Sequence, residues 1–232
     1  MTGFEQLTER FLAALRAGGG GVAGACRASV RVLPVQRAAI VIDEQHAGVQ
    51  PWCSSDAVAA GVEAVQATVG EGPAVDAVAT GVPVPVRDLA GPGDRWPGFA
   101  DALAGTRVSG AMVAVPLRLG ALRFGALDLY RDEPGPLDEA ALSAGLHIAD
   151  LITAQLVLAR SRRFGTDLDD DWLEQPMASR AIHQAAGMVV AQSNVTVPDA
   201  YARLRAYAFG HGMSLAEVAH AVVARRVRFD GE

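Results

Sequence analysis

The sequence predicts an α+β protein, in which an antiparallel sheet with flanking helices is followed by a long connecting helix and a C-terminal bundle of three helices. Three observations predict this architecture. Extended segments rich in β-branched residues alternate with helical segments before residue 131. Residues 137–164 carry one long helical pattern, and residues 177–229 carry three short ones. The predicted domains are residues 1–136, the connecting helix 137–164, an acidic linker 165–176 and the bundle 177–232.

Two helices are predicted to precede the sheet. Apolar residues recur at helical spacing from residue 4 to Arg16, and the glycine run 18–21 ends this helix. A second helix over residues 22–33 stops before Pro34, because the residue before a proline disfavours the helical conformation.

The predicted sheet begins with a hairpin of residues 37–43 and 49–54. A helix over 56–69 follows, and the two prolines of segment 82–86 confine that segment to a sheet edge. A short helix over 96–104 lies in a loop-rich insertion, and strands are predicted over 110–117 and 122–130. This order predicts an antiparallel sheet with helices on one face.

The long helix carries a seam of apolar residues at alternating spacings of three and four residues. Such a seam is typical of a coiled coil, and a helix of this length spans roughly 40 Å. We therefore expect it to pair with the same helix of a second chain, giving a homodimer; the alternative is that it lies on its own sheet. The seam residues are Leu142, Leu146, Ala149, Ile152, Leu156 and Ala159.

The three short helices each carry one apolar stripe, which only mutual packing can bury. Their starts are marked in the sequence. Thr196 is placed as an N-cap with Asp199 three residues later, and Ser214 with Glu217 fits a capping box.

This C-terminal stretch resembles the ANTAR family, the RNA-binding output domain of bacterial transcription antitermination regulators. The resemblance implies that the bundle binds a pair of small stem-loops in a nascent transcript, which prevents a terminator hairpin from forming. Ala186 departs from the pattern, because many members have a polar or basic residue there. The matching residues are Arg180, Ile182, Ala185, Gly187, Met188, Ala200, Tyr201, Leu204, Arg205, Ala208, Val218, Ala219, Val222 and Val223.

The preceding part, residues 4–158, resembles a GAF domain. The resemblance rests on Gly70–Pro73 with Ala77, on 84–89 and 113–117, and on Gly125–Tyr130. It implies a sensor domain in which a small-molecule ligand can bind between the sheet and the insertion. No bound cofactor is expected.

Composition excludes several function classes. The formal net charge of −6 argues against electrostatic binding of nucleic acid by the whole protein surface, so any such binding must be local. All twenty basic residues are arginine, which excludes phosphate loops with lysine, pyridoxal Schiff bases and lysine nucleophiles.

Cys26 and Cys53 are expected to form no disulfide framework, so a reducing cytoplasm is the predicted location. Neither an export signal nor a membrane span is expected.

Five arginines of the bundle are the predicted RNA contacts: Arg180, Arg203, Arg205, Arg225 and Arg226. Residues 177–232 hold six arginines against four acidic residues, so this part of an acidic protein is mildly basic. Guanidinium groups suit phosphates and stack on unpaired bases of RNA loops. A solvated helix face is the alternative interpretation of the same charges, and a bundle that does not bind RNA is the alternative function.

No catalytic or metal-binding set is predicted. The histidines lack metal-ligand spacing, and Cys53 is interpreted as a small buried apolar residue; a redox enzyme using Cys53 or Cys26 is the remaining enzymatic hypothesis. Asp128 alternates with apolar residues on a strand, so its side chain is expected to point either outward or into a pocket.

Overall fold

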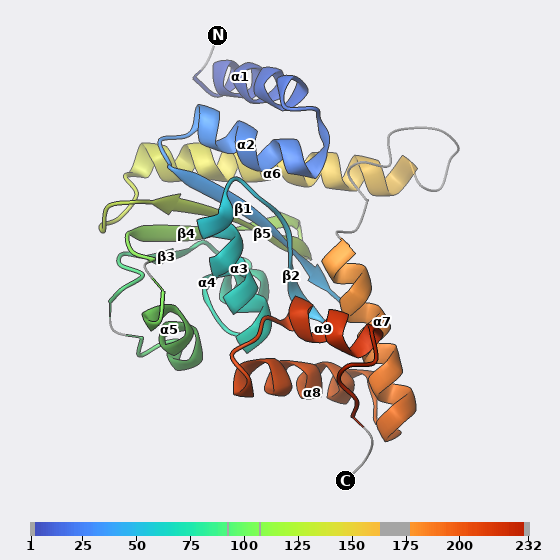
Figure 1. Ribbon diagram of the computed structural model, residues 1–232. Helices are drawn as coiled ribbons and strands as arrows, with labels where there is room; N and C mark the ends of the chain where they lie inside the picture. Colours follow the sequence, from blue (N-terminus) through green and yellow to red (C-terminus); the bar gives the residue numbers. More distant parts are fainter. Residues whose placement is uncertain (1–2, 92, 107, 163–176, 230–232) are drawn as a thin grey trace.

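The computed structural model describes residues 3–91, 93–106, 108–162 and 177–229, and it confirms the α+β architecture (Figure 1). The sheet has five antiparallel strands in the order β2-β1-β5-β4-β3. Strand β3 lies at one edge, as its prolines predicted, and β2 lies at the other. The bounds are β1 Arg37–Glu44, β2 Gly48–Ser54, β3 Val84–Val86, β4 Ala111–Leu119 and β5 Leu122–Arg131.

Two helices, α2 (Gly21–Val32) and α6 (Glu139–Arg162), cover one face of the sheet, and α1 (Gly3–Ala17) packs on the outer side of these two helices (Figure 1). Phe11 of α1 and Ile148 of α6 are fully buried in one apolar cluster with Ile40 and Leu127 of the sheet. This cluster is the first of two apolar cores in the domain.

The other face is covered by α3 (Ala57–Val69) and α4 (Pro73–Thr80), with α5 (Pro97–Ala104) packed on α3, so the prediction of helices on one face is wrong (Figure 1). The physical reason lies in the strands. Every residue from 111 to 117 of β4 is buried. A strand with one solvent-exposed face would instead show buried and exposed residues in alternation. A strand that is apolar on both sides requires cover on both faces.

Helix α4 was not expected from the sequence. It begins with Pro73 in its first turn and ends at Gly81, which adopts the left-handed conformation that favours glycine. Its eight residues are too few for a clear apolar period, so only these end signals could have revealed it.

The seam of α6 packs largely on its own sheet. Ala149, Ile152 and Leu156 are buried in the first core, whereas Leu146 is 39% exposed. Leu158, which is not a seam residue, is 48% exposed. The alternative interpretation, a helix lying on its own sheet, therefore describes most of the seam, and the dimer stays a prediction. By length and composition Glu139–Ala159 would also pass for a membrane span, and 39% of its most apolar window is buried inside the protein.

The C-terminal helices are α7 (Met177–Ser193), α8 (Val197–Gly210) and α9 (Leu215–Val223). The side chain of Thr196 accepts a hydrogen bond from the backbone N–H of Asp199, and the Ser214–Glu217 capping box is present. Both predicted helix starts are confirmed. The predicted linker, residues 165–176, lies outside the described residues.

Candidate nucleic-acid interface

The apolar stripes of α7, α8 and α9 meet in a third core. Ile182, Val189, Leu204 and Val218 are buried there with less than 3% of their surface exposed. Ala186 is also buried in this core, at 2% exposure. The position that departs from the ANTAR pattern therefore lies inside the bundle, in its apolar core.

Four of the five predicted RNA contacts are exposed. Arg180 lies near the start of α7, Arg203 on α8, and Arg225 and Arg226 directly after α9. None of the four forms an ion pair with a carboxylate in the described part of the chain. These guanidinium groups face solvent, and their N–H groups can donate hydrogen bonds to phosphate oxygens.

Arg205 is placed differently from Arg203, although the two are only two residues apart. Two residues turn an α-helix by about 200°, so these side chains leave α8 on nearly opposite sides. Arg205 is partly buried, and its Nη1 donates a hydrogen bond to the backbone oxygen of Ala47 at 3.1 Å. Burial lowers the pKa of its guanidinium, while the phenol of Tyr201 acts in the opposite direction. Arg205 thus belongs to a contact between the bundle and the preceding domain.

A second group of contacts surrounds Glu44, at the end of β1. The Oγ of Ser179 donates to Glu44 Oε1 at 2.7 Å, and His183 Nε2 lies 2.6 Å from Glu44 Oε2. The other ring nitrogen of His183 lies 2.5 Å from the hydroxyl of Tyr201. Burial and the nearby carboxylate of Glu44 raise the pKa of Tyr201. A continuous polar chain therefore connects the sheet to α7 and α8.

A third contact joins α9 to α3. The backbone N–H of Leu215, which no helical carbonyl can satisfy at a helix start, donates to Thr68 Oγ1 at 3.0 Å. Ala47 also belongs to the apolar core of the bundle. The turn between β1 and β2, together with α3, therefore forms the docking surface for the bundle (Figure 1).

Several hollows lie along this junction, and two of them are larger than 300 Å³. One, of about 360 Å³, lies between Val65 and Val69 of α3 and Phe209 of α8, and Phe209 is 57% exposed. The other, of about 520 Å³, is lined by residues of the β1–β2 turn, by Gln66 and by Arg205.

A small-molecule ligand was expected to bind between the sheet and the insertion, and this stays a prediction. Phe99 and Leu103 of α5 are buried there with Val84 and Met112. Next to them, on the α3 side of the sheet, lies a buried polar network. The network includes Asp128, whose side chain was expected to point either outward or into a pocket. The side chain points inward and is fully buried.

In this network, Gln66 Nε2 donates to Glu63 Oε2 at 2.7 Å and to Asp128 Oδ2 at 3.2 Å, and Tyr130 donates its hydroxyl hydrogen to Glu63. Burial raises the pKa of Asp128 to about 7. Burial first, and then the charge of Asp128, raise the pKa of Glu63. Two carboxyl groups this close favour holding a proton between them.

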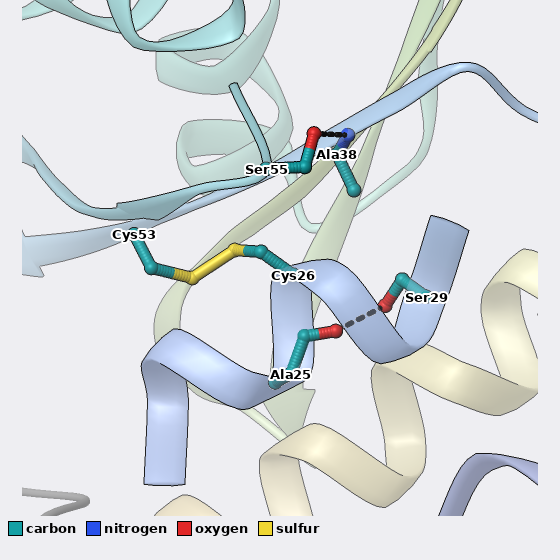
Figure 2. The surroundings of a disulfide bond; sticks show 6 residues. All are labelled: Ala25, Cys26, Ser29, Ala38, Cys53 and Ser55. Atoms are coloured by element: carbon teal, nitrogen blue, oxygen red, sulfur yellow. Dashed lines mark hydrogen bonds between the residues drawn. A yellow bond between two sulfur atoms is a disulfide. The ribbon is translucent and has the colours of Figure 1, made fainter. Parts of the chain in front are cut away.

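The two cysteines form a disulfide, contrary to the expectation that they would not (Figure 2). Cys26 lies on α2 and Cys53 near the end of β2, and the pair joins the helical layer to the sheet. Cys53 is therefore not simply a small apolar residue. Two cysteines that are 27 residues apart in sequence give no spacing signal, since only the packing of α2 on β2 brings them together. No cluster of three or more potential metal ligands occurs among the described residues.

Comparison with known structures supports the fold. The GAF domain of a phosphoenolpyruvate-protein phosphotransferase from Coxiella burnetii is 14% identical, with a TM-score of 0.51 over 70% of this chain and 99% of that one. The corresponding GAF domain from Acinetobacter is also 14% identical, with a TM-score of 0.51 over 73% of this chain and 100% of that one. Comparison with curated proteins gave no match.

Comparison with protein families identifies both halves. The model of the GAF domain matches residues 22–157, more than half of the chain, and the model of the ANTAR domain matches residues 173–223. Both are sensor and regulatory domains. The chain therefore belongs to the GAF family, and an ANTAR domain follows its GAF domain.

Proposed function

We propose that this protein is a transcription antitermination regulator that binds RNA stem-loops through its ANTAR domain under the control of its GAF domain. The observation that carries the proposal is the set of four exposed arginines, Arg180, Arg203, Arg225 and Arg226, on a domain of a family that binds RNA. The partner is a pair of stem-loops in a nascent transcript, and the cellular location is the cytoplasm.

The control acts through docking of the ANTAR domain. Arg205 belongs to the family pattern, yet its guanidinium donates to Ala47 of the GAF domain. An RNA that uses Arg205 must first displace that contact. The docked arrangement therefore corresponds to a state with weaker RNA binding, and a signal received by the GAF domain shifts the population toward an undocked state.

The proposal divides the chain into a sensor part, residues 1–136, the helix 137–164, a linker 165–176 and the RNA-binding part 177–232. It also includes a homodimer, in which the exposed Leu146 and Leu158 of α6 are candidate contacts. Two RNA-binding domains in one dimer would match two stem-loops and raise the effective concentration of the second contact.

Binding of the full chain to a paired stem-loop RNA, measured over a series of salt concentrations, tests the proposal. Each phosphate contact contributes about 0.7–0.9 to the slope of log affinity against log salt. Arg203→Ala should weaken binding and reduce that slope by about one contact. Arg10→Ala is the matched control, because Arg10 is an exposed arginine on α1 of the GAF domain, and it should leave the slope unchanged.

The alternative function, a GAF sensor whose ANTAR domain does not bind RNA, makes the opposite prediction. In that case, neither Arg203→Ala nor Arg180→Ala changes retention of the RNA, and binding at micromolar protein shows no salt dependence. That result would reject the proposed function.

A further inference from the structure

The disulfide between Cys26 and Cys53 lies at a position from which it can influence docking of the ANTAR domain on the GAF domain. Both sulfurs lie between α2 and the sheet (Figure 2). Cys26 is fully buried, whereas Cys53 is only partly buried. The sequence holds no other cysteine. The pair is therefore a single, isolated redox couple.

Strand β2, which carries Cys53, is an edge strand. It pairs with β1 alone, and its register shifts at the β-bulge opposite Ile40 and Val41, next to Cys53. On its other side, no strand of the described residues pairs with it. The disulfide fixes this end of β2 to the helical layer, so breaking it removes a constraint from the least supported strand on that side of the sheet.

The other end of β2 leads directly to the docking contact. Gln50 of β2 donates its side-chain N–H to the backbone oxygen of Ala47 at 3.0 Å, and Arg205 donates to the same oxygen at 3.1 Å. Gln50 and Cys53 are three positions apart along one strand, a distance of about 10 Å. A change in the position of β2 therefore reaches the acceptor on which Arg205 docks.

We propose that Cys26 and Cys53 form a reversible thiol–disulfide site, acted on by low-molecular-weight thiols and their disulfides, whose redox state sets how firmly the ANTAR domain docks. The consequence for RNA rests on the proposed function. That function places the chain beside nascent RNA, in a compartment where thiols keep most cysteines reduced and where protein disulfides are commonly transient or redox-sensing. The disulfide form is docked, and the dithiol form releases the ANTAR domain.

The external thiol is the reductant in this thiol–disulfide exchange. A thiolate attacks the sulfur of Cys53, the more accessible of the two; a mixed disulfide forms, and Cys26 leaves as a thiolate that takes up a proton. A second thiol attacks the mixed disulfide at the external sulfur, so that Cys53 leaves and is protonated. Two thiols become one external disulfide, and the protein gains two electrons and two protons. Oxidation is the reverse sequence.

The experiment uses the full chain equilibrated with mixtures of reduced and oxidised dithiothreitol. Alkylation followed by mass measurement gives the fraction of dithiol. Hydrogen exchange of the Leu215 amide reports docking directly, because that N–H donates across the junction to Thr68. We expect reduction to accelerate this exchange about tenfold, within the range of ordinary coupling between two sites.

The double variant Cys26→Ser with Cys53→Ser is the matched control, and its Leu215 exchange should not respond to dithiothreitol. The inference is overturned if the native disulfide cannot be reduced at any ratio, or if its reduction leaves Leu215 exchange unchanged. A variant that fails to fold does not decide the question, since the wild-type comparison of reduced and oxidised protein stands alone.

RNA binding separates this inference from the proposed function. Affinity that rises about tenfold on reduction supports both. If Leu215 exchange responds to reduction and no RNA is bound in either state, the redox site stands and the proposed function fails. Equal RNA affinity in both states overturns the link between redox state and RNA.

Discussion

The GAF domain buries a network of ionisable side chains between its sheet and α3, whereas the ANTAR domain keeps its arginines at its surface or at its contact with the GAF domain. Glu63 and Asp128 are both 0% exposed, but Arg180, Arg203, Arg225 and Arg226 are exposed. The GAF domain has two apolar cores, one on each face of the sheet. The single core of the ANTAR domain includes Ala47 of its neighbour.

This difference indicates which domain depends on the other. The ANTAR domain uses a GAF hydroxyl to satisfy the N–H of Leu215 and a GAF carboxylate to hold Ser179 and His183. None of these contacts contributes to the two cores around the sheet. We therefore expect substitutions in the GAF cores to lower the free energy of unfolding of the GAF domain. Substitutions at the junction should weaken docking of the ANTAR domain with little effect on the sheet.

The largest effect is expected for Gly125→Ala in β5. A Cβ atom at this position would lie 1.9 Å from the carbonyl oxygen of Val41, which is backbone and has no room to move within the sheet. The free energy of unfolding should fall by more than about 3 kcal/mol, as measured by urea denaturation. Gly61→Ala in α3, where a Cβ meets nothing within 4 Å, is the control and should not destabilise the protein.

A smaller effect, of order 2 kcal/mol, is expected from the pH dependence that Asp128 contributes. Its pKa is raised to about 7 in the folded chain from 3.8, so the folded protein holds this proton to higher pH than the unfolded chain. The resulting stability is complete below about pH 3.8 and is lost as pH rises through about 7. Asp128→Asn removes the titration.

The measurement compares unfolding free energies of the wild type and Asp128→Asn between pH 4 and 8. Wild-type stability should fall relative to the variant as pH rises. Parallel curves for the two proteins would show that the network does not hold a proton in this range.

Docking should weaken by about 1–3 kcal/mol in Glu44→Ala, because Ser179 and His183 lose a buried acceptor. Faster hydrogen exchange of the Leu215 amide would report this loss, with the sheet amides unchanged. The neighbouring Asp43 is exposed, so Asp43→Ala is a matched control with no expected effect. Equal exchange in the two variants would mean that Glu44 does not hold the junction.

The smallest effect is expected for Gly187→Ala in α7. This glycine lies on the exposed side of the helix, and an added Cβ meets nothing within 4 Å. Alanine should stabilise the helix by about 0.5–1 kcal/mol, because glycine loses more backbone freedom on folding. Thermal unfolding measures the change. A loss of stability would contradict the open surroundings of this position.

Local signals in the sequence were sufficient for most elements. The caps at Thr196 and Ser214 and the edge position of Val82–Val86 were predicted, because each depends on residues close together along the chain. Helix α4 was missed since its eight residues carry too short an apolar period. Cover on both faces of the sheet was missed, although the unbroken burial of β4 was already implied by its continuous apolar run.

The sequence by itself determined the two domain types, the three amphipathic helices of the ANTAR domain and the restriction of basic charge to arginine. The tertiary structure alone decided that Cys26 meets Cys53, that Ala186 is buried, and that Arg205 faces Ala47 across 158 positions of sequence while Arg203 faces solvent. The physical reason is that capping and hydrophobic period are set within a few residues. The side of a helix that meets another domain is set only when distant surfaces pack.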